Sequence, residues 1–134
     1  MDKLKWIAFV LVFLICGCAS VQTGKKMTLY DDTSRAYLRA LRWGDYESAY
    51  AFKNPQGTDI KMPDFENMGQ IRVTAYKVKQ TILSEDQSAI VSIVEFQYYR
   101  MTNVTVKTVI DQQKWEYDEE ADRWYLSSDL PDFK

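Results

Sequence analysis

The chain has 134 residues, with 17 lysines and arginines against 19 aspartates and glutamates, two cysteines and no histidine. The absence of histidine excludes Ser-His-Asp and Cys-His catalysis, the commonest zinc ligand and the usual general base near neutral pH. The composition is mildly acidic and no basic face is concentrated in it, which argues against binding to nucleic acid.

The first 17 residues have the pattern of a secretory signal. Lys3 and Lys5 form a positive head, and an uncharged apolar run follows from Trp6 to Ile15. A helix that spans a membrane needs roughly 20 apolar residues, and this run is shorter. We therefore expect residues 1–17 to be a cleaved signal peptide, with an uncleaved anchor as the weaker alternative.

The end of that run, Ile15-Cys16-Gly17-Cys18, resembles the lipobox of bacterial lipoproteins. There, an aliphatic, a variable and a small residue precede the cysteine that receives diacylglycerol. The resemblance implies that Cys18 carries the lipid and that the protein is tethered to a membrane. Ala19, not aspartate, follows the cysteine. In enterobacterial lipoproteins this implies the outer membrane, so we expect a bacterial envelope protein that faces the periplasm.

This assignment uses both cysteines. Cys16 leaves with the signal and Cys18 is acylated, so the folded part has no thiol for a disulfide, a nucleophile or a metal site. About 115 residues remain, which suits one domain with its own core. We expect neither a metal nor a cofactor.

Residues 18–30 are expected to form the lipidated N-terminus and a flexible tether, because 19–26 is polar and contains Gly24 and a lysine pair. A single domain is expected over residues 31–134. Its first helix would be capped by Asp31, Asp32 or Thr33 and would end at Gly44.

Asp45 offers a cap for a second helix, in which Tyr46, Ala49 and Tyr50 share one face. The two helices would form a hairpin. Residues 53–70 contain prolines and glycines and are expected to be mostly loop, with one helical turn near residues 64–68. The alternative is that this loop forms a mobile lid.

Strand character begins at residue 71. β-Branched and aromatic residues alternate with short polar turns, which predicts four strands over 71–83, 89–100, 104–117 and 124–127. Such strands form an antiparallel meander. The fold class is therefore α+β, with an N-terminal helical hairpin packed in a curved four-stranded antiparallel sheet.

Two segments resemble small nuclear-transport-factor-2-like domains. The first is residues 36–50, AYLRALRWGDYESAY, where a Gly-Asp break separates two aromatic-rich helices. The second is the closing pair KWEY (114–117) and RWYL (123–126). The resemblance covers residues 31–133 and implies a cone of sheet and helices, in which enzymes of this superfamily use Asp, His or Tyr. A cystatin-like fold is the alternative.

Six aromatic residues are candidates for an apolar pocket with polar tips: Trp43, Tyr50, Phe52, Tyr98, Trp115 and Trp124. The alternative is that they form ordinary core. The acidic stretch 118–122 lacks the spacing of a calcium loop, so we interpret it as a solvated turn. No residue is predicted to be catalytic.

Three functions remain open. The favoured one is a non-catalytic, membrane-tethered envelope lipoprotein that binds a small apolar ligand or an envelope protein. The second is a small enzyme of isomerase or hydrolase type that uses Asp and Tyr, which a buried carboxylate with a raised pKa would support. The third is a structural subunit of an envelope assembly, which a long exposed strand edge would support.

Overall fold

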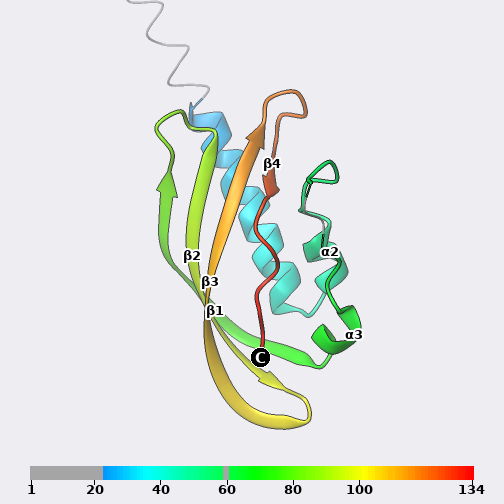
Figure 1. Ribbon diagram of the computed structural model, residues 1–134. Helices are drawn as coiled ribbons and strands as arrows, with labels where there is room; N and C mark the ends of the chain where they lie inside the picture. Colours follow the sequence, from blue (N-terminus) through cyan, green and yellow to red (C-terminus); the bar gives the residue numbers. More distant parts are fainter. Residues whose placement is uncertain (1–22, 59–60) are drawn as a thin grey trace, which may run out of the picture.

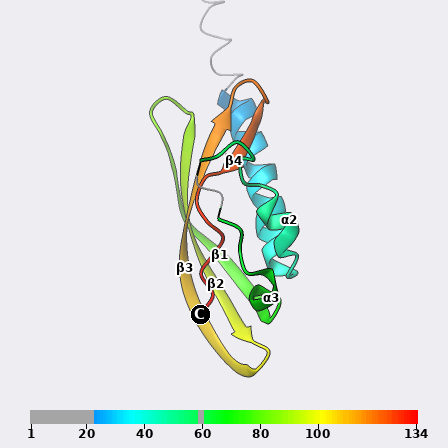
Figure 2. The ribbon, with the colours of Figure 1, turned by 45° about the vertical axis from the view of Figure 1, so that its right-hand side comes forward.

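The computed structural model describes residues 23–58 and 61–134. The predicted signal peptide and the lipidation site Cys18 lie outside these residues. The described elements form two layers, with the sheet on one side and the helices packed against one of its faces (Figures 1 and 2). None of the helices in these residues has the length and apolarity to cross a bilayer.

Residues 23–42 are helical, which corrects the prediction that the flexible tether extends to residue 30. Met27, Tyr30 and Tyr37 recur at helical spacing and pack into the core, and Tyr30 is only 4% exposed. The helix continues on both sides of the expected cap residues 31–33, so they lie inside it and not at its start. The domain therefore includes residues 23–30.

The N-terminal end of this helix contacts two chain turns that are distant in the sequence. The Thr23 hydroxyl donates to Oε1 of Gln87 at 2.7 Å. Lys25 pairs with Asp122 at 2.9 Å, and Lys26 pairs with Glu119 at 2.7 Å. The lysine pair that suggests a solvated tether in the sequence thus binds the acidic turn at residues 119–122.

The break after the long helix is confirmed. Gly44 has a φ of 74°, a conformation that glycine adopts without the steric cost of a Cβ. The Asp45 carboxylate accepts a hydrogen bond from the Ser48 amide at 3.1 Å and caps α2 (Tyr46–Tyr50). The helical turn expected in the following loop is α3 (Phe65–Met68), which Asp64 caps in the same way.

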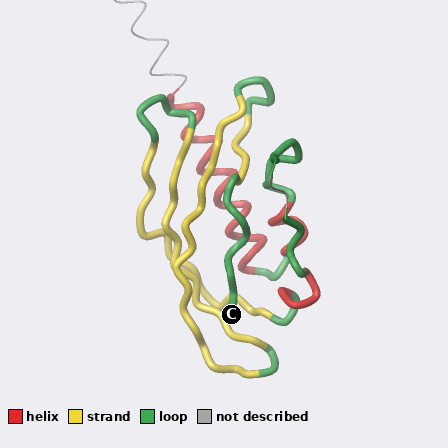
Figure 3. Tube along the Cα trace, in the orientation of Figure 1, coloured by secondary structure: helices red, strands yellow, loops and turns green. Residues whose placement is uncertain are grey.

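The predicted meander is also confirmed in the described residues. Its strands are β1 (Ile71–Leu83), β2 (Ala89–Arg100), β3 (Asn103–Asp118) and β4 (Arg123–Leu126), and they neighbour one another in chain order (Figure 3). All pairs are antiparallel. Register shifts near Thr74 and Lys79 mark two irregularities in β1.

The core fills the space between the long helix and the sheet. Tyr37 and Leu41 from the helix meet Phe96, Trp115 and Trp124 from three strands, and each of the five is at most 1% exposed. The aromatic rings pack edge to face, with the centroids of Tyr37 and Trp115 5.3 Å apart. The helix-covered face of the sheet is therefore close-packed near β3 and β4.

Candidate functional site

The six aromatic residues singled out in the sequence do not form one pocket. Trp115, Trp124 and Tyr98 are at most 3% exposed and belong to the core, because the long helix and Phe133 pack against them. Trp43, in contrast, is 75% exposed, and its ring lies against the Arg42 guanidinium.

The remaining two candidates differ from each other. Phe52 is partly buried and packs edge to face on Tyr37, with centroids 5.9 Å apart. Tyr50 lines a surface cleft of about 500 Å³. Of the six aromatic residues, Tyr50 alone lines this cleft.

The cleft lies between residues 61–68, which include α3, and the C-terminal segment 129–133. Apolar side chains supply much of its lining: Met62, Pro63, Met68, Ile71, Leu130, Pro131 and Phe133. A volume of this size is typical of sites that hold small organic molecules.

Both walls of the cleft are anchored to the fold. On one side, Phe65 of α3 packs edge to face on Tyr50, with centroids 5.7 Å apart. On the other side, the Phe133 ring lies 4.9 Å from that of Tyr98, whose hydroxyl donates to the Lys134 carbonyl at 2.9 Å. The shape of the cleft is therefore largely preformed.

Two polar side chains lie inside the apolar lining. The Tyr50 hydroxyl is buried and has no hydrogen-bond partner among the described residues. The Lys53 side chain is 9% exposed, and its ammonium donates to the Ser128 carbonyl at 3.1 Å and to the Asp129 carboxylate at 2.9 Å. Lys53 is thus already neutralised, whereas Tyr50 has an unused hydrogen-bonding group.

The charged lining is close to neutral. Asp64, Asp129 and Asp132 line the cleft together with Lys53 and Lys61, but Asp129 pairs with Lys53 and Asp132 pairs with Lys134. The paired charges leave little net field in the cleft, which suits an uncharged polar group.

A second set of unpaired polar groups lies inside the core. Oδ2 of Asp111 and the Tyr37 hydroxyl are buried and lack hydrogen-bond partners in the described part of the chain. Burial raises the pKa of Asp111 to about 6, although the neighbouring Gln113 amide opposes the shift. Burial, and then the charge of Asp111, raise the pKa of Tyr37 well above its ordinary value.

Neither Asp111 nor the C-terminal segment that lines the cleft is singled out by the sequence analysis. Asp111 occupies an inward position of β3, two and four residues before Gln113 and Trp115, and this period-two spacing is the signal that would have found it. The contribution of the C-terminal segment has a weaker signal, the apolar Leu130 and Phe133 after the last strand.

The acidic turn after β3 is not a cation site in the described structure. Its Asp118 carboxylate accepts hydrogen bonds from the Glu120 and Ala121 amides, while Glu119 and Asp122 pair with lysines of the long helix. Among residues 23–58 and 61–134, no group of three or more potential ligands is placed to hold a metal ion.

No protein-family model matches this chain, and no curated protein or solved structure is significantly similar to it.

Proposed function

We propose that this protein is a lipid-anchored module of the bacterial envelope that holds a small, mainly apolar molecule without chemical change. The cleft beside α3 carries the proposal. It has the volume of a ligand site, anchored walls, an apolar lining and few polar groups, which is the usual make-up of a small-molecule pocket.

The polar groups restrict the chemistry of the ligand. A buried hydroxyl without a partner costs about 1–3 kcal/mol, and a ligand oxygen or nitrogen would remove that cost once the Tyr50 ring turned its covered hydroxyl toward the cleft. The carboxylates of Asp129 and Asp132 are paired with lysines, so the lining favours an uncharged group at this point. The proposed ligand is therefore an uncharged apolar molecule with one hydrogen-bonding group.

Fluorescence titration with N-phenyl-1-naphthylamine, a neutral apolar amine, tests the cleft. Met68→Trp fills it and should weaken binding at least tenfold. Met101→Trp is the matched control, because Met101 is 52% exposed in the β2–β3 turn and does not line the cleft. Equal binding by the parent and both variants would contradict the proposal. Native mass spectrometry of protein from its own host would then show which natural molecule is retained.

The lipid anchor has its own test. Cys18→Ala should abolish incorporation of labelled palmitate and leave the protein unprocessed. Cys16→Ala is the control, and this variant should be acylated like the parent. Acylation of the Cys18→Ala protein, or loss in both variants, would refute attachment at Cys18. Density-gradient separation of the labelled membranes tests the proposed outer-membrane location.

Asp111 favours a second candidate function, a small enzyme. A buried carboxylate with a pKa near 6 beside a tyrosine hydroxyl has the properties of a general base near neutral pH. Asp111 does not line the cleft of about 500 Å³, so substrate would have to reach it by another route. Isomerisation of a β,γ-unsaturated ketone or hydrolysis of a p-nitrophenyl ester tests this candidate. Activity that Asp111→Asn removes would support it, and equal rates for parent and variant would exclude both reactions.

We further propose that the domain is a nuclear-transport-factor-2-like cone, with the cystatin-like arrangement as the alternative. Support comes from the curved antiparallel meander, the Gly44-Asp45 break and the packing of α2 on the core. A crystal structure would decide the matter. Superposition on cone-shaped domains over both the sheet and α2 is expected, and a match limited to one helix and the sheet would favour the cystatin-like fold.

A further inference from the structure

One edge of the sheet is open beyond Val73, whose carbonyl accepts a hydrogen bond from Arg42, as that of Ile71 does from Tyr46. β1 has 13 residues and, in the described structure, pairs with β2 alone. After Val73 every residue of the strand is exposed. The main-chain N–H and C=O groups on its other side therefore face solvent, and another extended chain can pair with them (Figure 1).

The helix-covered side of this edge is apolar. The register places Tyr76, Val78 and Leu83 opposite the buried residues Phe96, Val94 and Ile90, yet the three are 38%, 44% and 36% exposed. The long helix does not cover them. An added strand would place alternate side chains beside these residues.

A groove beside the edge provides space for those side chains. It measures about 230 Å³ and lies between the long helix and β1, with Tyr30, Ser34 and Leu38 on one side and Tyr76 and Val78 on the other. Polar and charged residues also line it: Asp31, Arg35, Thr81 and the buried Ser92 and Gln113. The groove thus combines apolar side chains with polar groups and one charge of each sign, directly beside unpaired main chain.

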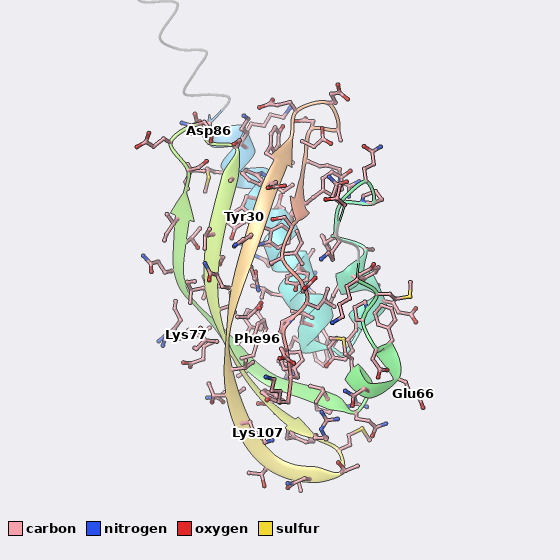
Figure 4. The ribbon with its side chains drawn as sticks, viewed as in Figure 1. Tyr30, Glu66, Lys77, Asp86, Phe96 and Lys107 are labelled. Atoms are coloured by element: carbon pink, nitrogen blue, oxygen red, sulfur yellow. The ribbon has the colours of Figure 1, made fainter. Side chains whose placement is uncertain are left out.

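The opposite side of the same edge is basic. β1 contains Arg72, Lys77 and Lys79 and no acidic residue. Lys79 pairs with Glu95 at 3.5 Å, while Lys77 has no ion pair within the described residues. Figure 4 shows Lys77 on the free side of β1 and Phe96 toward the interior.

The positive charge of the β1 lysines favours an acidic strand over a second copy of this chain as the binding partner. A second copy that paired antiparallel through β1 would bring the same lysines together, and like charges on neighbouring strands are destabilising. An acidic strand would instead gain charge attraction along the edge.

We propose that the free edge of β1 binds an extended segment of a partner protein by strand addition, and that this segment alternates acidic and apolar residues. The apolar residues would lie over Tyr76, Val78 and the groove, and the acidic residues would lie on the side of Lys77. This interaction surface is separate from the small-molecule cleft and does not depend on it.

Peptide binding to the full chain, purified with its lipid in detergent, tests the proposal. The probe is a peptide of alternating glutamate and valine, and its lysine–valine analogue is the comparison. We expect the acidic peptide to bind more tightly and to slow hydrogen exchange over residues 75–83. The Lys77→Glu, Lys79→Glu double variant should bind the acidic peptide about tenfold more weakly and should prefer the basic one.

Lys114→Glu is the matched control, because Lys114 is an exposed lysine of β3, away from this edge. It should bind both peptides like the parent. Met68→Trp should also bind the acidic peptide normally, which separates this surface from the cleft. Equal affinity for the two peptides, protection outside β1, or a dimer that the double variant abolishes would overturn the proposal, the last by assigning the edge to a second copy.

Discussion

The two edges of the sheet differ in length and in what covers them. β4 has four residues, and the Phe52 carbonyl accepts a hydrogen bond from its Leu126 amide at 2.8 Å, next to a bridge between Lys53 and Leu126. The indole of Trp124 donates to the Lys26 carbonyl at 2.9 Å. β1 has 13 residues, and Tyr46 and Arg42 donate to its Ile71 and Val73 carbonyls. Beyond Val73, no strand of the described structure pairs with its outer side.

This difference indicates that the β4 edge contributes to the stability of the fold, whereas the β1 edge is free to bind another chain. At β4, segments distant in sequence meet, so a change there should loosen the long helix and the α2 region together. At β1, apolar and basic side chains already face water, so their loss should cost the folded state little.

Trp124→Ala should have the largest effect. It removes a side chain that is 1% exposed, its ring contacts with Tyr30 and Tyr117, and the hydrogen bond to Lys26. We expect a loss of roughly 3–5 kcal/mol in the free energy of unfolding, measured with urea. Val78→Ala, at the open edge, should cost less than about 1 kcal/mol. Similar losses in the two variants would contradict the contrast between the edges.

Asp111→Asn should stabilise the protein by an amount that grows from about pH 4 and is complete above about pH 6. The pKa of Asp111 is raised from 3.8 to about 6 in the folded state, so the folded state binds this proton more tightly than the unfolded state does. The free energy of unfolding therefore falls as pH rises from 4 to 6, by about 3 kcal/mol. The variant lacks this fall. Urea unfolding should therefore give equal free energies of unfolding for parent and variant at pH 4, and a free energy about 3 kcal/mol higher for the variant at pH 8.

Asp86→Asn provides a control of opposite sign. Hydrogen bonds from Ser84 and Ser88 lower the pKa of Asp86 to about 2, so this carboxylate favours the folded state above pH 4 and loses that effect as pH falls toward 2. Its replacement should not stabilise the protein at pH 8. A gain there from both substitutions would mean that general charge reduction, and not the burial of Asp111, is responsible.

Gly44→Val should cost at least about 1 kcal/mol. An added Cβ would meet its nearest neighbour, the Tyr46 ring, at 3.9 Å, so the loss comes from the backbone at φ 74° and not from a clash. Thermal unfolding measures it. Gly44→Asn should cost less, because asparagine tolerates this conformation better than β-branched residues do. Equal melting of parent and both variants would show that the turn does not depend on glycine.

Lys26→Ala should have the smallest effect. Lys26 pairs with Glu119, which is 72% exposed, and its ammonium lies 4.7 Å from the centre of the Tyr117 ring. We expect a loss below about 1 kcal/mol at low salt that shrinks at high salt. A larger loss, unchanged by salt, would mean that packing of the lysine stem joins the long helix to the closed edge.

The strands were predictable because their signals are local. The boundaries of β1 and β2 agree with the expected residues 71–83 and 89–100, since β-branched runs end at short polar turns. Gly44 and Asp45 likewise mark a helix break by their own conformation and capping chemistry. Such features depend on a few neighbouring residues.

The errors concern contacts between distant segments. Residues 23–30 look like a polar tether until Lys25 and Lys26 meet the turn at 118–123 and Tyr30 meets Trp115 and Trp124. The predicted pocket failed for the same reason, because residue type alone does not show which aromatic rings another element will cover. Trp43 and Trp115 are alike in the sequence, yet one is 75% exposed and the other fully buried.

The sequence by itself therefore determined the order of the strands, the boundaries of β1 and β2 and, within one residue, those of β3 and β4, together with the break at Gly44 and the absence of histidine chemistry. Only the tertiary structure decided that Asp111 is buried, that a cleft forms beside Tyr50, and that β4 is covered while β1 stays open. The physical reason is that turns and alternation arise from local backbone preferences. Burial depends on the contacts that a residue makes with segments far away in the chain.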